Sequence, residues 1–111
     1  MWRVFGRFLP GSRASMRAAK DAGRRVFKVT ADTRMSLEEH GVVFLQIRRG
    51  AVLRANATGR RIVELLIQKQ DLAEIARQMS VEYGLPFTQV EGDVRAFVGN
   101  LHANGLIAAD N

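Results

Sequence analysis

The sequence predicts an α+β domain in which a three-stranded antiparallel sheet is followed by three helices, an arrangement that resembles a winged helix-turn-helix. Apolar extended segments come first, separated by short breaks that each contain a glycine. Amphipathic helical segments follow, bounded by capping residues and helix breakers. A chain of 111 residues supplies one hydrophobic core, so we expect a single folded domain over residues 26–111.

The extended segments are rich in Val, Ile, Leu and Phe and lie at residues 33–38, 42–48 and 51–55. We expect Gly41 and Gly50, which fall in the breaks, to supply the positive φ of tight hairpins. Successive side chains of a strand point to opposite faces, which divides the middle segment into two sets: Val43, Leu45 and Ile47, and Phe44, Gln46 and Arg48. One set should face the core, and the other should be partly solvated.

The first two helices follow directly. We expect Thr58 to cap the first helix, which should end near Gln70 and bury Ile62, Leu65 and Leu66. The second helix opens with Asp71-Leu72-Ala73-Glu74, which has the pattern of a capping box, and Gly84 and Pro86 should end it. Its apolar stripe at helical spacing is Leu72, Ile75, Ala76, Met79 and Tyr83.

The third helix is predicted from a second pattern of the capping-box type, Thr88-Gln89-Val90-Glu91. Asn104-Gly105 should form a left-handed C-cap, after which Leu106 and Ile107 return to the core. The buried stripe of this helix is expected to be Val90, Val94, Phe97, Val98 and Leu101.

The net charge of +6 is unevenly distributed. Residues 1–30 carry eight basic residues and one acidic residue, whereas the rest of the chain carries nine basic and ten acidic residues. Residues 1–25 offer little apolar surface, so we expect a basic, flexible N-terminal tail. The alternative is a short helix that docks on a membrane surface or a partner through Trp2, Phe5 and Leu9.

Residues suited to catalysis are sparse. The chain has no cysteine, and neither His40 nor His102 has a second ligand at metal-binding spacing, so we expect neither a metal site nor an enzyme. No glycine-rich phosphate loop is present, so no nucleotide or other cofactor is expected. No apolar run approaches the roughly 20 residues of a membrane-spanning helix, and no secretory signal is apparent, which favours a cytoplasmic location.

Nucleic-acid binding by a winged helix that uses the basic N-terminal arm is the alternative function. It requires a basic last helix. Residues 88–104 instead contain Arg95 against Glu91 and Asp93, which makes a contact between this helix and phosphates unfavourable. The positive charge outside the tail lies in a stretch without acidic residues, at Arg48, Arg49, Arg54, Arg60 and Arg61. It favours an acidic, extended peptide as ligand, and the alternative is a solvated hairpin tip without a ligand.

The ordered motifs resemble the PqqD-like family, also called RiPP recognition elements, which bind the leader peptides of ribosomally made natural products. The similarity begins with a strand that runs into Leu53-Arg54-Ala55-Asn56-Ala57-Thr58-Gly59 and ends with Asp93-Val94-Arg95-Ala96-Phe97, Leu101, Gly105 and Leu106. It departs from the family pattern at Ala55, where a Leu is usual, and in the basic tail.

The resemblance implies that a leader peptide adds as a strand beside residues 51–55 and lies against the last helix. The expected peptide-binding residues are Ala51, Val52, Leu53, Arg54, Ala55, Arg95, Val98 and His102. On the last helix the opposite flank, formed by Asp93, Asn100 and Asn104, is the alternative. The chain would present the precursor peptide to a modifying enzyme, either a radical S-adenosylmethionine protein or a leader protease, and would itself be a monomer or a weak homodimer.

Overall fold

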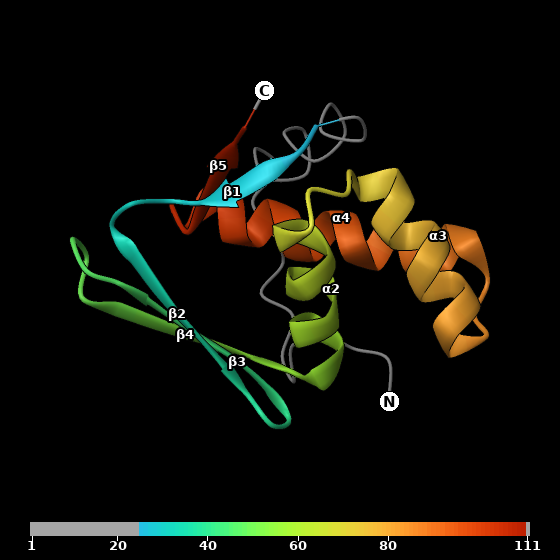
Figure 1. The fold of residues 1–111 in the computed structure, drawn as a ribbon, viewed down its shortest axis with the longest axis horizontal. Coiled ribbons are helices and arrows are strands. Elements are labelled where there is room, and N and C mark those ends of the chain that lie inside the picture. Colours follow the sequence, from blue (N-terminus) through green and yellow to red (C-terminus); the bar gives the residue numbers. More distant parts are fainter. Residues whose placement is uncertain (1–24, 111) are drawn as a thin grey trace.

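The computed structural model describes residues 25–110, and Figure 1 shows how they are arranged. In chain order the elements are β1 (Phe27–Val29), β2 (Thr33–Glu38), β3 (Gly41–Gln46), β4 (Ala51–Asn56), α2 (Ala57–Ile67), α3 (Leu72–Tyr83), α4 (Phe87–Ala103) and β5 (Ile107–Ala109). The predicted α+β class is confirmed, because β2, β3 and β4 form a three-stranded antiparallel sheet and three helices follow it. Apart from Arg25, the predicted basic tail lies outside the described residues.

The three predicted strands are present, with small shifts at their ends. β3 begins one residue earlier than expected and stops at Gln46, whereas β4 continues to Asn56. Val42 and Phe44 are buried, so they mark the core face of β3, and the odd-numbered Leu45 and Ile47 lie on the solvated face. The polar side chain of Gln46 also faces inward, and both ends of its amide are hydrogen-bonded.

Gly50 has a φ of 63°, as predicted for the β3–β4 turn. The prediction for Gly41 is wrong, because positive φ among the described glycines occurs at Gly50, Gly84 and Gly105 instead. A Cβ added to Gly41 would lie 2.3 Å from the carbonyl oxygen of Ala55 on the neighbouring strand. Gly41 is therefore required by the close approach of β3 and β4, and the β2–β3 hairpin needs no left-handed glycine.

Helix α2 is capped by Asn56 and not, as predicted, by Thr58. The chain is still extended at Asn56, whose side-chain oxygen accepts a hydrogen bond from the backbone N–H of Gly59 at 3.1 Å. Thr58 lies inside the first turn and is buried. Asparagine is among the best N-cap residues, and here it forms a direct junction between β4 and the helix.

The capping box of α3 is confirmed in both directions, with Glu74 N–H donating to Asp71 at 2.8 Å and Asp71 N–H donating to Glu74 at 2.9 Å. Gly84 ends the helix, as expected, and adopts the left-handed conformation. The second box is wrong, since α4 begins at Phe87 and its N-cap, Pro86, makes no side-chain hydrogen bond. Phe87 packs against the core, and this contact outweighs a side-chain cap at Thr88.

A second, two-stranded sheet was not predicted. β1 pairs antiparallel with β5, with Phe27 opposite Ala109 and Val29 opposite Ile107. As predicted, Gly105 has positive φ (72°) and Leu106 returns to the core. The sheet joins the beginning and the end of the described chain beside the C-terminal end of α4 (Figure 1).

The core lies between the three helices, the inner face of the three-stranded sheet and the β1–β5 pair. Its largest fully buried side chains include Phe44, Phe97, Ile62, Leu65, Ile75, Met79 and Leu101. The apolar stripes predicted for α2 and α4 are wholly buried, while Tyr83 at the end of the α3 stripe is 40% exposed. This core fixes the sheet against the helices and leaves β4 at an edge of the sheet.

Candidate functional site

Strand β4 has one pairing partner among the described residues, because the strand order is β2-β3-β4. Its opposite side therefore carries backbone N–H and C=O groups that no strand within residues 25–110 pairs with. Such an edge can accept a further strand, which would take affinity from main-chain hydrogen bonds. β4 leads directly into the Asn56 cap of α2, so its end is held in place by the helix.

The pairing register assigns the side chains of β4 to two faces. Leu53 lies opposite the buried Phe44 and packs against the core. Val52 and Arg54 lie opposite Leu45 and Val43 and point to the outer face, where Val52 is 58% exposed. The predicted segment thus presents an inner row and an outer row: Ala51, Leu53 and Ala55, and Val52 and Arg54.

Ion pairs neutralise part of the positive charge of the basic cluster predicted at residues 48–61. Arg48 lies 3.1 Å from Asp32, Arg60 lies 3.3 Å from Glu64, and Arg61 lies 2.7 Å from Glu82. Within residues 25–110, Arg49 and Arg54 are the members of this cluster without a salt bridge, and both are exposed. The positive charge available to a ligand at β4 is therefore centred on Arg54, with Arg49 at the preceding hairpin.

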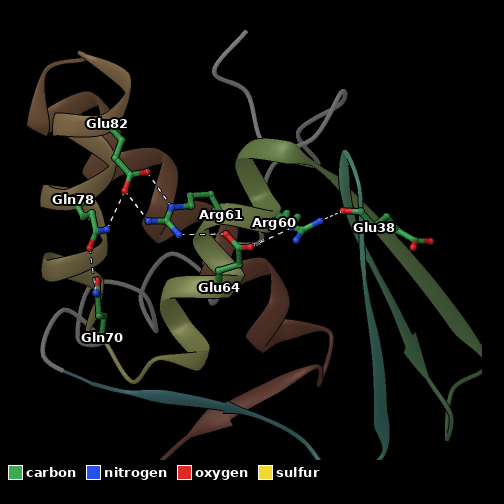
Figure 2. Close-up of polar contacts among 7 residues, drawn as sticks. All are labelled: Glu38, Arg60, Arg61, Glu64, Gln70, Gln78 and Glu82. Carbon is green, nitrogen blue, oxygen red and sulfur yellow. Dashed lines mark hydrogen bonds and ion pairs between the residues drawn. The ribbon is translucent and has the colours of Figure 1, made fainter.

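Arg60 and Arg61 instead connect elements, as Figure 2 shows. Arg61 donates to both carboxylate oxygens of Glu82 on α3, at 2.9 and 2.7 Å, and its guanidinium also reaches Glu64 at 3.3 Å. The Arg60 guanidinium donates to the backbone carbonyl of Glu38 at the end of β2. The two arginines tie the sheet, α2 and α3 together beside the β4–α2 junction.

The contact between Arg61 and Glu82 favours the charged form of both side chains. The hydrogen bond from Arg61 lowers the pKa of the Glu82 carboxyl, and a further bond from Gln78 adds to this effect, while partial burial opposes it. The same contact with Glu82 raises the pKa of Arg61. Both groups remain ionised near neutral pH, so the network acts as a structural support and offers no acid–base pair.

The three residues predicted on α4 have different surroundings. Val98 is 1% exposed and belongs to the hydrophobic core, and Arg95 forms an ion pair with Glu91 one turn earlier, at 3.7 Å. The His102 ring packs edge-on against Phe27 of β1, with 5.9 Å between the ring centroids. These contacts direct His102 toward the β1–β5 sheet, and the part that this flank plays in binding stays a prediction.

The roles of Asn56 and Gln46 were missed by the sequence interpretation. Asn56 precedes Ala57-Thr58-Gly59, and its cap position follows from the preference of asparagine for helix N-termini. Gln46 donates from its amide nitrogen to the carbonyl oxygen of Gly105 at 3.0 Å, which joins the end of β3 to the end of α4. No local pattern marks that contact, because its partners lie far apart in the sequence.

Residues 25–110 contain neither a metal-binding cluster nor a membrane-spanning helix. No group of three or more His, Cys, Asp or Glu side chains within residues 25–110 could hold a metal ion. In the same part of the chain, none of the helices has the length and apolar character needed to span a membrane.

Family comparison connects this geometry with known proteins. Residues 41–107 match the family model described as Coenzyme PQQ synthesis protein D (PqqD), and this match covers the sheet from β3 onward and all three helices. This chain belongs to the PqqD family. The match confirms the family resemblance drawn from the sequence motifs, and a comparison with curated protein sequences gives no match.

Solved structures similar to this PqqD-family chain are described as complexes. One is "Lasso peptide synthetase B1 complexed with the leader peptide", with 28% identity and a TM-score of 0.68, covering 74% of this chain and 96% of that one. Another is "TbiB1 in Complex with the TbiA(beta) Leader Peptide", with 28% identity and a TM-score of 0.67, covering 72% and 93%. The shared architecture thus extends over nearly the whole of the two solved chains and about three quarters of this chain.

Proposed function

We propose that this PqqD-family chain recognises the leader of a ribosomally synthesised precursor peptide, binds it as an added strand along β4 and presents the remainder to a separate enzyme. Membership in the family and similarity to two leader-peptide complexes support leader binding. The observation that carries the docking position is the edge location of β4 in the sheet. An extended guest there completes the ladder that β3 begins.

The two rows of β4 side chains suggest the pattern of the guest. Side chains of an added strand alternate between the two faces of the sheet, so neighbouring guest residues would lie near Leu53 and near Arg54 in turn. The row beside Leu53 favours apolar groups, because that row borders the core. The row beside Arg54 favours carboxylates, so the leader should alternate apolar and acidic residues over the docked segment.

The proposed role is non-catalytic. His40 lies in the β2–β3 turn, highly exposed and 3.7 Å from Glu39, whereas His102 packs on Phe27 at the other end of the domain. The chemistry would come from the partner, for which a radical S-adenosylmethionine enzyme and a leader protease are both compatible. Charge on α4 argues against DNA reading, since its Arg95 is already engaged with Glu91.

Titration of the full chain with a labelled leader peptide of this pattern tests the proposal. We expect chemical-shift changes at the Leu53 and Arg54 amides. Arg54→Glu should weaken binding by roughly three- to tenfold, because a favourable charge becomes repulsive at an exposed position. The matched control is Arg77→Glu, which makes the same charge change on the exposed surface of α3 and should leave affinity unchanged. Undisturbed β4 amides at saturating peptide would refute the docking position.

A further inference from the structure

The outer face of the three-stranded sheet carries an apolar patch beside the β4 edge. Leu45 on β3 lies directly opposite Val52 on β4, and Ile47 is exposed in the turn that follows β3. These side chains are 39%, 58% and 51% exposed, respectively. The inner row of the same sheet already supplies the core, so these residues do not contribute to packing the domain. We call Leu45, Ile47 and Val52 the outer patch.

Cationic side chains border the outer patch on both edge strands. Arg34 on β2 lies opposite Leu45, and Arg54 on β4 lies opposite Val43, one row further along. Between His40 and Val63 the sequence has no acidic residue, so β3 and β4 carry positive charge only. On β2 the same face carries Glu38 at the far end of the strand, beside the β2–β3 turn. Asp32, paired with Arg48, is the nearest carboxylate at this end of β2.

This distribution of charge selects the kind of partner. A second copy of the chain that docked face to face would place arginines against arginines, which costs free energy unless they are screened. A nucleic acid would leave the exposed apolar side chains without a contact, since phosphates interact with the cations alone. A folded protein with an apolar centre and an acidic border satisfies both features.

We propose that the outer patch is the docking surface for the enzyme that acts on the captured peptide, and that the enzyme contributes an apolar surface bordered by Asp and Glu. The inference rests on the proposed function, because a guest strand on β4 leaves the outer face open. Val52 and Arg54 lie on this outer face and also belong to β4, the strand beside which the guest peptide would bind. An enzyme bound here lies alongside the docked leader, which places the following precursor residues within its reach.

The test measures the affinity of the full chain for the purified modifying enzyme or leader protease encoded beside its gene, with and without leader peptide. The double variant Leu45→Thr with Ile47→Thr removes apolar surface, and threonine is a β-branched residue that suits a strand. We expect enzyme affinity to fall at least tenfold and leader affinity to stay within twofold. Val81→Thr on α3 is the matched control, because Val81 is 82% exposed and lies outside the sheet.

Arg34→Glu provides a second variant, independent of apolar area. It should weaken enzyme binding most at low salt, because the border acts through charge. Unchanged enzyme affinity in both variants would overturn the proposal. An equal loss of leader binding, or of binding to a duplex DNA probe, would also overturn it. A change in the sedimentation of the chain alone would overturn it too, because it would indicate an interface between two copies of the chain. Failure of the unaltered chain to bind leader would count against the proposed function, whereas enzyme binding without leader tests the outer patch separately.

Discussion

At the scale of single residues, Gly41 shows how closely two strands approach. The carbonyl oxygen of Ala55 occupies the space that a Cβ at Gly41 would need. Gly41→Ala should therefore push β4 away from β3 and destabilise the domain by about 1–3 kcal/mol, measured by urea unfolding. Gly92→Ala is the control, because nothing lies within 4 Å of its added Cβ, and alanine in a helix should be neutral or stabilising. Equal effects at both glycines would contradict this explanation.

Leu53 and Val52 are neighbours in sequence with opposite surroundings, and they allow a second comparison. Leu53 packs against the core, whereas Val52 is mostly exposed. Leu53→Asp should cost about 2–4 kcal/mol or unfold the domain, because a carboxylate would be partly buried without a partner. Val52→Asp should leave the fold intact. Thermal unfolding followed by circular dichroism distinguishes the two, and a Leu53→Asp variant as stable as Val52→Asp would show that the assigned register is wrong.

At the scale of elements, the sequence predicted those whose signals are local. The α3 capping box and the end of α3 at Gly84 depend on residues within a few positions of one another, and both were predicted correctly. The starts of α2 and α4 were misplaced for different reasons. The cap of α2 is a local signal at Asn56 that the prediction assigned to Thr58, whereas α4 begins at Phe87, which packs against the core. Strand β4 could be predicted, and the pairs of Arg60 and Arg61 with Glu64 lie within one turn of α2. The pair between Arg61 and Glu82 could not be predicted, because Glu82 is remote in sequence.

The β1–β5 sheet had no local sequence signal from which it could be predicted, and the carboxylate of Asp110 stabilises it. Lys69 donates to Asp110 at 2.7 Å and lowers the pKa of that carboxyl below its ordinary value of 3.8, with a smaller effect from Lys28. A lowered folded-state pKa means that the stabilisation is present above pH 3.8 and is lost as the pH falls through the folded value. Asp110→Asn should therefore speed amide exchange in β5 at pH 6, and the difference from the unaltered chain should vanish at the acidic end of a pH series. A difference that persists unchanged below this range would rule out the ion pair as the cause.

At the scale of the whole molecule, the contacts divide the domain into a rigid support and two open sheet surfaces. The connections through Arg60, Arg61 and Glu82 hold the sheet, α2 and α3 in fixed relation (Figure 2). Gln46 adds a link to the end of α4. The β4 edge and the outer patch project from this support. A site on rigid elements loses little conformational entropy when a ligand binds, which suits the capture of an extended, initially disordered peptide that must itself become ordered.

Removal of residues 1–24 separates the two functions considered for this chain. In the proposed binding mode, peptide capture depends on β4 and its inner and outer rows, all of which lie in the described domain, so the truncated chain should bind leader peptide within about twofold of the full chain. Nucleic-acid affinity, if it depends on the basic arm, should disappear with the truncation, and in the full chain it should fall steeply with salt. Fluorescence anisotropy with a labelled leader and a labelled DNA duplex at two salt concentrations measures both. Loss of leader binding on truncation, with the domain still folded by circular dichroism, would mean that the arm forms part of the peptide site.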